Sequence, residues 1–79
     1  MFINKAKDGK NNICGKKIYT LRKNLKISQR ELAVMMQIAE IDIDKNAIQR
    51  IEAGKRFVTD IELVIFAKVL KTNIQYLLS

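Results

Sequence analysis

The chain has 79 residues, with no histidine, no proline and one cysteine, and it carries a formal net charge of +7. This length supports one domain with a single modest core, and Cys14 alone can form neither an internal disulfide nor a multi-cysteine zinc site. No apolar run approaches the roughly 18 residues of a membrane span, and the opening is too short for a signal peptide, so we expect a soluble, cytoplasmic protein.

The positive charge is concentrated in the N-terminal part of the chain. Residues 1–30 contain nine Lys and Arg but only one acid, Asp8, whereas residues 31–79 contain six bases and seven acids. A basic block of this kind suits a polyanion, and nucleic acid is the commonest polyanion for a small basic domain. The alternative is a solvated tail that only aids solubility.

We predict that residues 1–13 form a flexible basic arm ahead of a domain over residues 14–79. The arm is rich in asparagine and lysine and shows no sustained helical or strand period. Cys14 is interpreted as a small packing residue, because the chain has no histidine that could activate its thiol.

The first two predicted helices are identified by different signals. Apolar residues recur at helical spacing over residues 15–25, and Arg22 shares their face, so this arginine needs a partner. The second helix is expected to begin at Gln29, because Ser28 and Glu31 have the spacing of a capping box, in which each side chain bonds the other residue's amide.

A connection is expected after the second helix ends, near Ala39 or Glu40. Residues 41–44 alternate apolar and acidic side chains in the manner of a strand, but a four-residue strand without a partner makes a poor sheet. We therefore expect an extended connection, with Ile41 and Ile43 turned inward and the acidic side chains facing outward.

The third predicted helix, residues 45–53, has two different faces. Asp44 is placed to cap its first amides, and Gly54 can adopt the left-handed conformation that ends a helix. At 3.6 residues per turn, Ala47, Ile48 and Ile51 fall on one face. The opposite face, which is free to contact a partner, contains Lys45, Asn46, Gln49 and Arg50.

Two further helices complete the chain. Thr59 and Glu62 repeat the capping-box spacing ahead of a wide apolar band, which indicates a helix packed on two sides. Asn73 is expected to cap a last short helix over Ile74 to Leu78, which closes the core.

Five short helices, with a small second helix and a polar-faced third, are the layout of a helix-turn-helix DNA-binding domain. Short motifs between Ile18 and Leu78 resemble, in order, those of the lambda-repressor-like Cro/CI (Xre) family. The resemblance implies an all-α, compact five-helix domain with a lengthened connection between helices two and three, since more residues separate Gln29 from Lys45 than in the family's tight version. The motifs are Leu21-Arg22, Ser28-Gln29-Arg30-Glu31-Leu32-Ala33, the stretch from Ile48 to Arg56, Ala67-Lys68-Val69-Leu70 and the stretch from Ile74 to Leu78.

The resemblance also implies roles for individual residues. Positions matching Lys45, Asn46 and Arg50 read base edges in the major groove, and we include their neighbour Gln49; the chemistry fits, since lysine and arginine suit guanine and asparagine suits adenine. Arg22 and Glu52 match a buried ion pair, which would supply the partner that Arg22 needs. The expected phosphate contacts are Gln29, Arg30, Lys55, Arg56, Lys16 and Lys17.

The function expected from these features is sequence-specific binding of double-stranded DNA by a transcriptional repressor or regulator, acting as a homodimer. The alternative is a protein-interaction module, such as an antitoxin-like domain, that uses Phe57, Val58 and Tyr76 as a partner patch. A membrane-surface peptide is disfavoured because the lysines do not oppose one long apolar stripe. An enzyme is disfavoured because the sequence offers no catalytic constellation, phosphate loop, metal site or cofactor motif.

Overall fold

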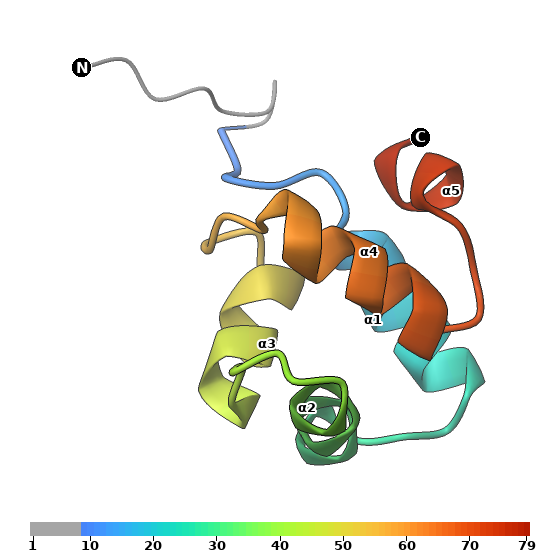
Figure 1. Ribbon diagram of the computed structural model, residues 1–79. Coiled ribbons are helices and arrows are strands. Elements are labelled where there is room, and N and C mark those ends of the chain that lie inside the picture. The colour runs from blue at the N-terminus through green and yellow to red at the C-terminus, as the bar shows by residue number, and fades with distance from the viewer. Residues whose placement is uncertain (1–8) are drawn as a thin grey trace.

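The computed structural model describes residues 9–79, and over this range the chain forms five helices and no strand. The prediction of an all-α, five-helix domain is confirmed. Residues 1–8 of the predicted arm lie outside the described part of the chain. The helices, shown in chain order in Figure 1, are α1 (Gly15–Asn24), α2 (Gln29–Ile38), α3 (Lys45–Glu52), α4 (Asp60–Val69) and α5 (Ile74–Leu78).

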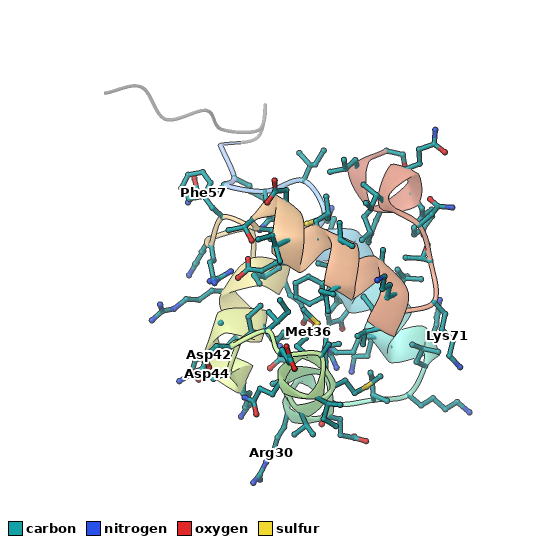
Figure 2. The ribbon with its side chains drawn as sticks, viewed as in Figure 1. Arg30, Met36, Asp42, Asp44, Phe57 and Lys71 are labelled. Atoms are coloured by element: carbon teal, nitrogen blue, oxygen red, sulfur yellow. The ribbon has the colours of Figure 1, made fainter. Side chains whose placement is uncertain are left out.

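The core lies where α1, α2, α3 and α4 meet. Phe66 on α4 is its largest fully buried side chain, and Met36 on α2 points into the same centre (Figure 2). α3 contributes Ile48 and Ile51, both 0% exposed, and α5 closes the core with Leu77. Burying these apolar side chains, rather than intrinsic helix propensity, is what stabilises helices this short.

Side chains satisfy the free amides at four helix starts. Ser28 with Glu31 and Thr59 with Glu62 both form the predicted capping boxes at α2 and α4. Asp44 Oδ1 accepts a bond of 2.7 Å from the amide of Ala47 at the start of α3. Asn73 likewise caps α5. Capping residues can be identified from sequence because each acts within a single turn.

The connection between α2 and α3 is long, as predicted. It comprises residues 39–44, whereas the usual helix-turn-helix connection has about three or four residues. Ile43 is 1% exposed and Ile41 packs against the core, while Glu40, Asp42 and Asp44 are all exposed. The connection is therefore held by its isoleucines, and its acidic side chains face solvent.

The structure differs from the sequence prediction just before α1. Residues 10–13 belong to the predicted flexible arm, but Asn12 donates a hydrogen bond to the carbonyl of Ile51 near the end of α3, and Asn11 and Asn12 donate to carbonyls in the loop that follows. These hydrogen bonds join residues 11 and 12 to the helical domain. Cys14 itself is buried, as expected for a packing residue.

Within residues 9–79, no helix has the length and apolar character needed to cross a membrane.

Candidate nucleic-acid interface

The two faces of α3 divide as its sequence pattern predicted. Ile48 and Ile51 are buried in the core, and the four residues of the polar face are exposed. The helix ends at Glu52, and Gly54 follows with φ +77°, a left-handed conformation that favours glycine. The exposed polar face consists of Lys45, Asn46, Gln49 and Arg50.

A shallow depression joins three of these residues to the loop after α3. It is lined by Asn46, Gln49 and Arg50, together with Ala53 and Lys55. The structure therefore brings part of the predicted base-reading set together with one predicted phosphate contact. Its hydrogen-bonding groups, amides and cations, are those that recognise base edges and phosphates.

Lys45 belongs to a second, larger depression, at the start of α2. The N-terminus of α2 lies at this depression, and the dipole of a helix N-terminus favours anions, although the capping box already bonds the amides of Ser28 and Glu31. Of the cationic and amide residues here, Gln29, Arg30 and Lys45 were predicted DNA contacts and Arg22 a predicted ion-pair residue, whereas Lys23 and Lys26 were not predicted. The signal that could have identified these two lysines is their position shortly before the capping box at the start of α2. The depression is lined by Arg22, Lys23, Lys26, Ile27, Ser28, Gln29, Arg30, Glu31 and Lys45.

A buried polar network ties this depression to α3. Arg22 Nε lies 2.7 Å from Glu52 Oε2, and Arg22 Nη2 lies 3.1 Å from Glu52 Oε1. Gln29 Nε2 donates to the same Oε1 at 3.0 Å, and Arg22 Nη1 donates to the carbonyl of Ile27 at 2.9 Å. Gln29 is therefore oriented by Glu52, and α1, α2 and α3 are joined at one carboxylate.

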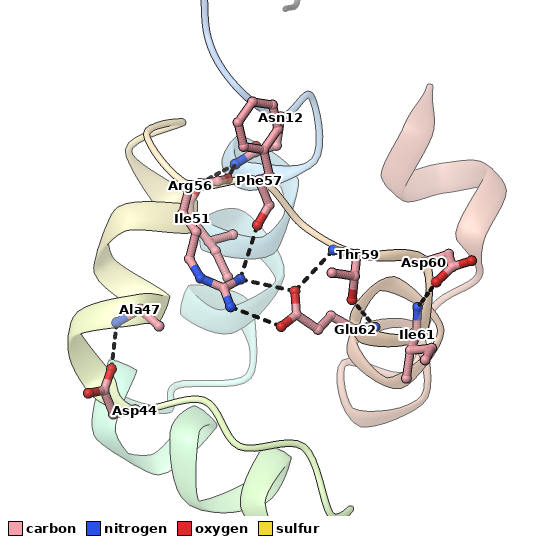
Figure 3. Close-up of polar contacts among 10 residues, drawn as sticks. All are labelled: Asn12, Asp44, Ala47, Ile51, Arg56, Phe57, Thr59, Asp60, Ile61 and Glu62. Atoms are coloured by element: carbon pink, nitrogen blue, oxygen red, sulfur yellow. Dashed lines mark hydrogen bonds and ion pairs between the residues drawn. The ribbon is translucent and has the colours of Figure 1, made fainter. Parts of the chain in front are cut away.

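Arg56 is engaged inside the domain. Its Nη1 and Nη2 each lie 3.0 Å from a carboxylate oxygen of Glu62, and Nη1 also donates to the carbonyl of Phe57 (Figure 3). Bonds from the Arg56 guanidinium hold the pKa of Glu62 below its ordinary value, and the bond to Glu62 raises the pKa of Arg56. This pair fastens the loop after α3 to the start of α4.

The remaining predicted phosphate contacts lie in different places. Arg30 projects from α2 into solvent (Figure 2), and Lys16 is exposed on the first turn of α1. Lys17 instead bonds the carbonyl of Tyr76 at 2.9 Å and lies over the Tyr76 ring. Since α5 lies at the other end of the molecule from α3 (Figure 1), the structure does not bring Lys17 to the α3 face.

Acidic residues flank the α3 face on one side. Asp42 and Asp44 lie beside the start of α3 in Figure 2, and the carboxylate of Asp44 is used as the helix cap. Over residues 9–79, no group of three or more His, Cys, Asp or Glu side chains is arranged to hold a metal ion. The polar groups at this surface can form hydrogen bonds and charge pairs.

Comparison with known proteins agrees with this geometry. Residues 18–77 match the model of the helix-turn-helix family. The P22 c2 repressor protein, solved in complex with synthetic operator 9T in the presence of Tl+, is 28% identical, with a TM-score of 0.73, over 85% of this chain and 94% of that one. The restriction-modification controller protein C.AhdI from Aeromonas hydrophila shares the fold, with 23% identity and a TM-score of 0.70 over 81% of this chain and 86% of that one. No curated protein sequence gave a match. The chain is a member of the Cro/CI-type helix-turn-helix family.

Proposed function

We propose that this protein is a sequence-specific binder of double-stranded DNA and acts in the cytoplasm as a transcriptional repressor. The observation that carries this proposal is the exposed polar face of α3, whose residues line two depressions together with other cations and amides. An α-helix fits the major groove, where each base pair presents a distinct set of donors and acceptors. The protein is a binding module, with no role as an enzyme.

Four residues on α3 are proposed to read bases. Arg50 and Lys45 can each donate to O6 and N7 of guanine, while Asn46 and Gln49 can bond N6 and N7 of adenine. All four are exposed, and the apolar residues between them anchor the helix in the core. A rigid helix keeps these donors and acceptors at fixed spacing, which sequence discrimination requires.

Phosphate contacts are proposed on both sides of α3. On one side, Gln29 and Arg30 stand with Lys23 and Lys26 around the N-terminus of α2. On the other side, Lys55 lines the depression beside Arg50. We assign Arg56 an indirect part, because its guanidinium holds the loop that carries Lys55. Contacts to phosphate set the register of the protein on DNA but carry no sequence information.

The repressor role and the use of two copies rest on similarity. The P22 c2 repressor was solved with a synthetic operator, and helix-turn-helix proteins commonly bind as dimers to half-sites about one helical turn apart. We therefore propose that two copies of this chain bind a near-palindromic operator.

Selection from a random duplex library, followed by a salt titration of the selected site against a scrambled duplex, tests this proposal. We expect one enriched motif with two-fold symmetry, and affinity that falls steeply with salt because bound cations displace counterions from phosphate. Absence of an enriched motif, together with equal weak binding to all duplexes, would show that the protein does not read sequence.

A protein-binding role is the second candidate, favoured by large apolar side chains left at the surface. Phe57 is 48% exposed, Ile61 66% and Tyr76 42%. Light scattering on DNA-free protein tests what these side chains bind: a dimer would favour self-association, whereas a stable monomer would leave them for another protein.

A further inference from the structure

Residues 10–15, which we call the strap, cross the C-terminal end of α3. Figure 1 shows this segment running past the loop after α3 and into the start of α1. The strap contributes no side chain to either cationic depression. The hydrogen bonds of Asn11 and Asn12 are nevertheless made to the end of α3, to the loop that follows it and to the first residue of α1.

Asn12 bonds the C-terminal end of α3, although it lies far from α3 in the sequence. Its Nδ2 donates to the carbonyl of Ile51 at 3.1 Å and to the carbonyl of Arg56 at 2.7 Å, as Figure 3 shows. Its Oδ1 accepts from the amide of Gly15 at 2.8 Å. The carbonyl of Ile51 also accepts from the amide of Gly54 at 3.0 Å, so Asn12 adds a second bond to this carbonyl in the last turn of α3 and ties it to the following loop.

Asn11 bonds two of the four residues between those anchor points. Its amide donates to the carbonyl of Gly54 at 2.8 Å, and its Nδ2 donates to the carbonyl of Lys55 at 2.9 Å. Asn11 and Asn12 together thus bond the carbonyls of three successive residues, 54 to 56. The amide of Lys55 is also held, since it donates to the carbonyl of Arg50 at 2.8 Å.

Two glycines allow the strap to approach this closely. A Cβ on Gly15 would lie 2.2 Å from the carbonyl oxygen of Ile51, and a Cβ on Gly54 would lie 2.6 Å from Cδ of Lys10. The first is a clash with backbone that no rotamer change can relieve. The close packing of strap against helix end is therefore specific to these residues.

We propose that Asn11 and Asn12 are positioning residues for Lys55, which they hold at a fixed place beside the base-reading face of α3. This inference rests on the proposed function. Lys55 is exposed, and it lines the same depression as Arg50 and Gln49. Its backbone is held by hydrogen bonds, since its amide donates to Arg50 and its carbonyl accepts from Asn11. A phosphate contact made from an ordered loop avoids the entropy of ordering that loop on binding.

The test is a double-mutant cycle between the strap and Lys55, read as the slope of log affinity against log salt for the selected operator. In the unmodified protein, Lys55→Ala should reduce the magnitude of this slope by about one, as for one lost phosphate contact. In the Asn11→Ala/Asn12→Ala background, Lys55→Ala should reduce it by less than half as much, because Lys55 is no longer held. Equal reductions in both backgrounds would overturn the proposal.

Asn73→Ala is the matched control, since it removes a helix cap at α5, remote from α3. In this background, Lys55→Ala should keep its full effect on the slope. The control therefore separates the effect of general destabilisation from the effect of releasing Lys55. If the double strap variant does not fold, Asn11→Ala alone removes the side-chain bond to the Lys55 carbonyl and serves in the same cycle.

Amide hydrogen exchange gives a readout that needs no DNA. Removing the strap asparagines should speed exchange at the Lys55 amide while leaving the α2 amides protected, and unchanged exchange at Lys55 would overturn the proposal. If the unmodified protein shows no salt-dependent binding, the proposed function fails. If it binds and the Lys55 effect is independent of the strap, the positioning role alone fails.

Discussion

Arg22 in α1 and Glu52, the last residue of α3, form a two-bond ion pair 30 positions apart in sequence, with side chains only 6% and 5% exposed. The carboxylate also accepts from Gln29 at the start of α2. One acidic group thus fixes the position of α3 relative to both preceding helices. A buried pair of this kind is costly to break, because the surviving charge is left without water or a partner.

Replacing Arg22 by methionine should therefore destabilise the fold strongly. We expect a loss of about 3–5 kcal/mol in the free energy of unfolding, because Glu52 is left buried without its cation. The double variant Arg22→Met/Glu52→Leu should recover part of this loss, since no charge is stranded. Urea unfolding monitored by circular dichroism measures both, and a double variant less stable than the single one would contradict this explanation.

Arg50→Ala and Lys55→Ala should weaken DNA binding in different ways. Loss of Arg50 should reduce discrimination between operator and scrambled duplex by about 1–3 kcal/mol, because a bidentate contact to a base edge is removed. Loss of Lys55 should weaken both duplexes alike. Binding isotherms on the two duplexes at one salt concentration separate the effects, and equal losses from both variants would remove Arg50 from the base-reading set.

Asp44 combines a useful cap with an unfavourable charge. Asp44→Ala should destabilise the domain by about 1 kcal/mol, because the amide of Ala47 loses its partner. Asp44→Asn keeps the capping oxygen and removes the charge, so it should unfold at nearly the same urea concentration and bind all DNA about twofold to threefold more tightly. Weaker binding by the asparagine variant would show that Asp44 is not near phosphate.

Gly15→Ala should lower the stability of the domain, although replacing glycine by alanine in a helix usually raises it. Alanine within a helix is normally favoured over glycine by about 1 kcal/mol, but here its Cβ would lie 2.2 Å from the Ile51 carbonyl oxygen. We expect net destabilisation of about 1–3 kcal/mol, as for other forced overpacking. The control is Asn24→Ala at the exposed last residue of α1, which should leave the urea midpoint almost unchanged.

The pair between Arg56 and Glu62 predicts a pH dependence of stability. Because the folded state lowers the pKa of Glu62, its stabilisation is present above the pKa of the unfolded chain and is lost as pH falls through the folded value. At pH 7, Glu62→Gln should be less stable than the unmodified protein by roughly 1 kcal/mol, a modest value because Arg56 is partly exposed. The difference in unfolding free energy between the variant and the unmodified protein should be smaller at pH 3 than at pH 7. An equal difference at both pH values would contradict the assignment.

The sequence by itself determined the helices and the division of α3 into two faces. Caps such as Ser28, Thr59 and Asp44 act within one turn, and helical periodicity is a local property, so both can be identified without knowing the fold. Even the long connection after α2 was predictable, because Ile41 and Ile43 alternate with acids that must face water.

Tertiary structure decided which cations are available at the α3 face. Lys17 and Arg56 have the same formal charge as Lys55, but Lys17 is held by α5 and Arg56 by Glu62. It also decided that Asn11 and Asn12 belong to the folded domain, since their partners lie 39 to 44 positions away. Hydrogen bonds over such separations leave no periodic trace in the sequence, because they depend on where the packed helices bring distant backbone carbonyls.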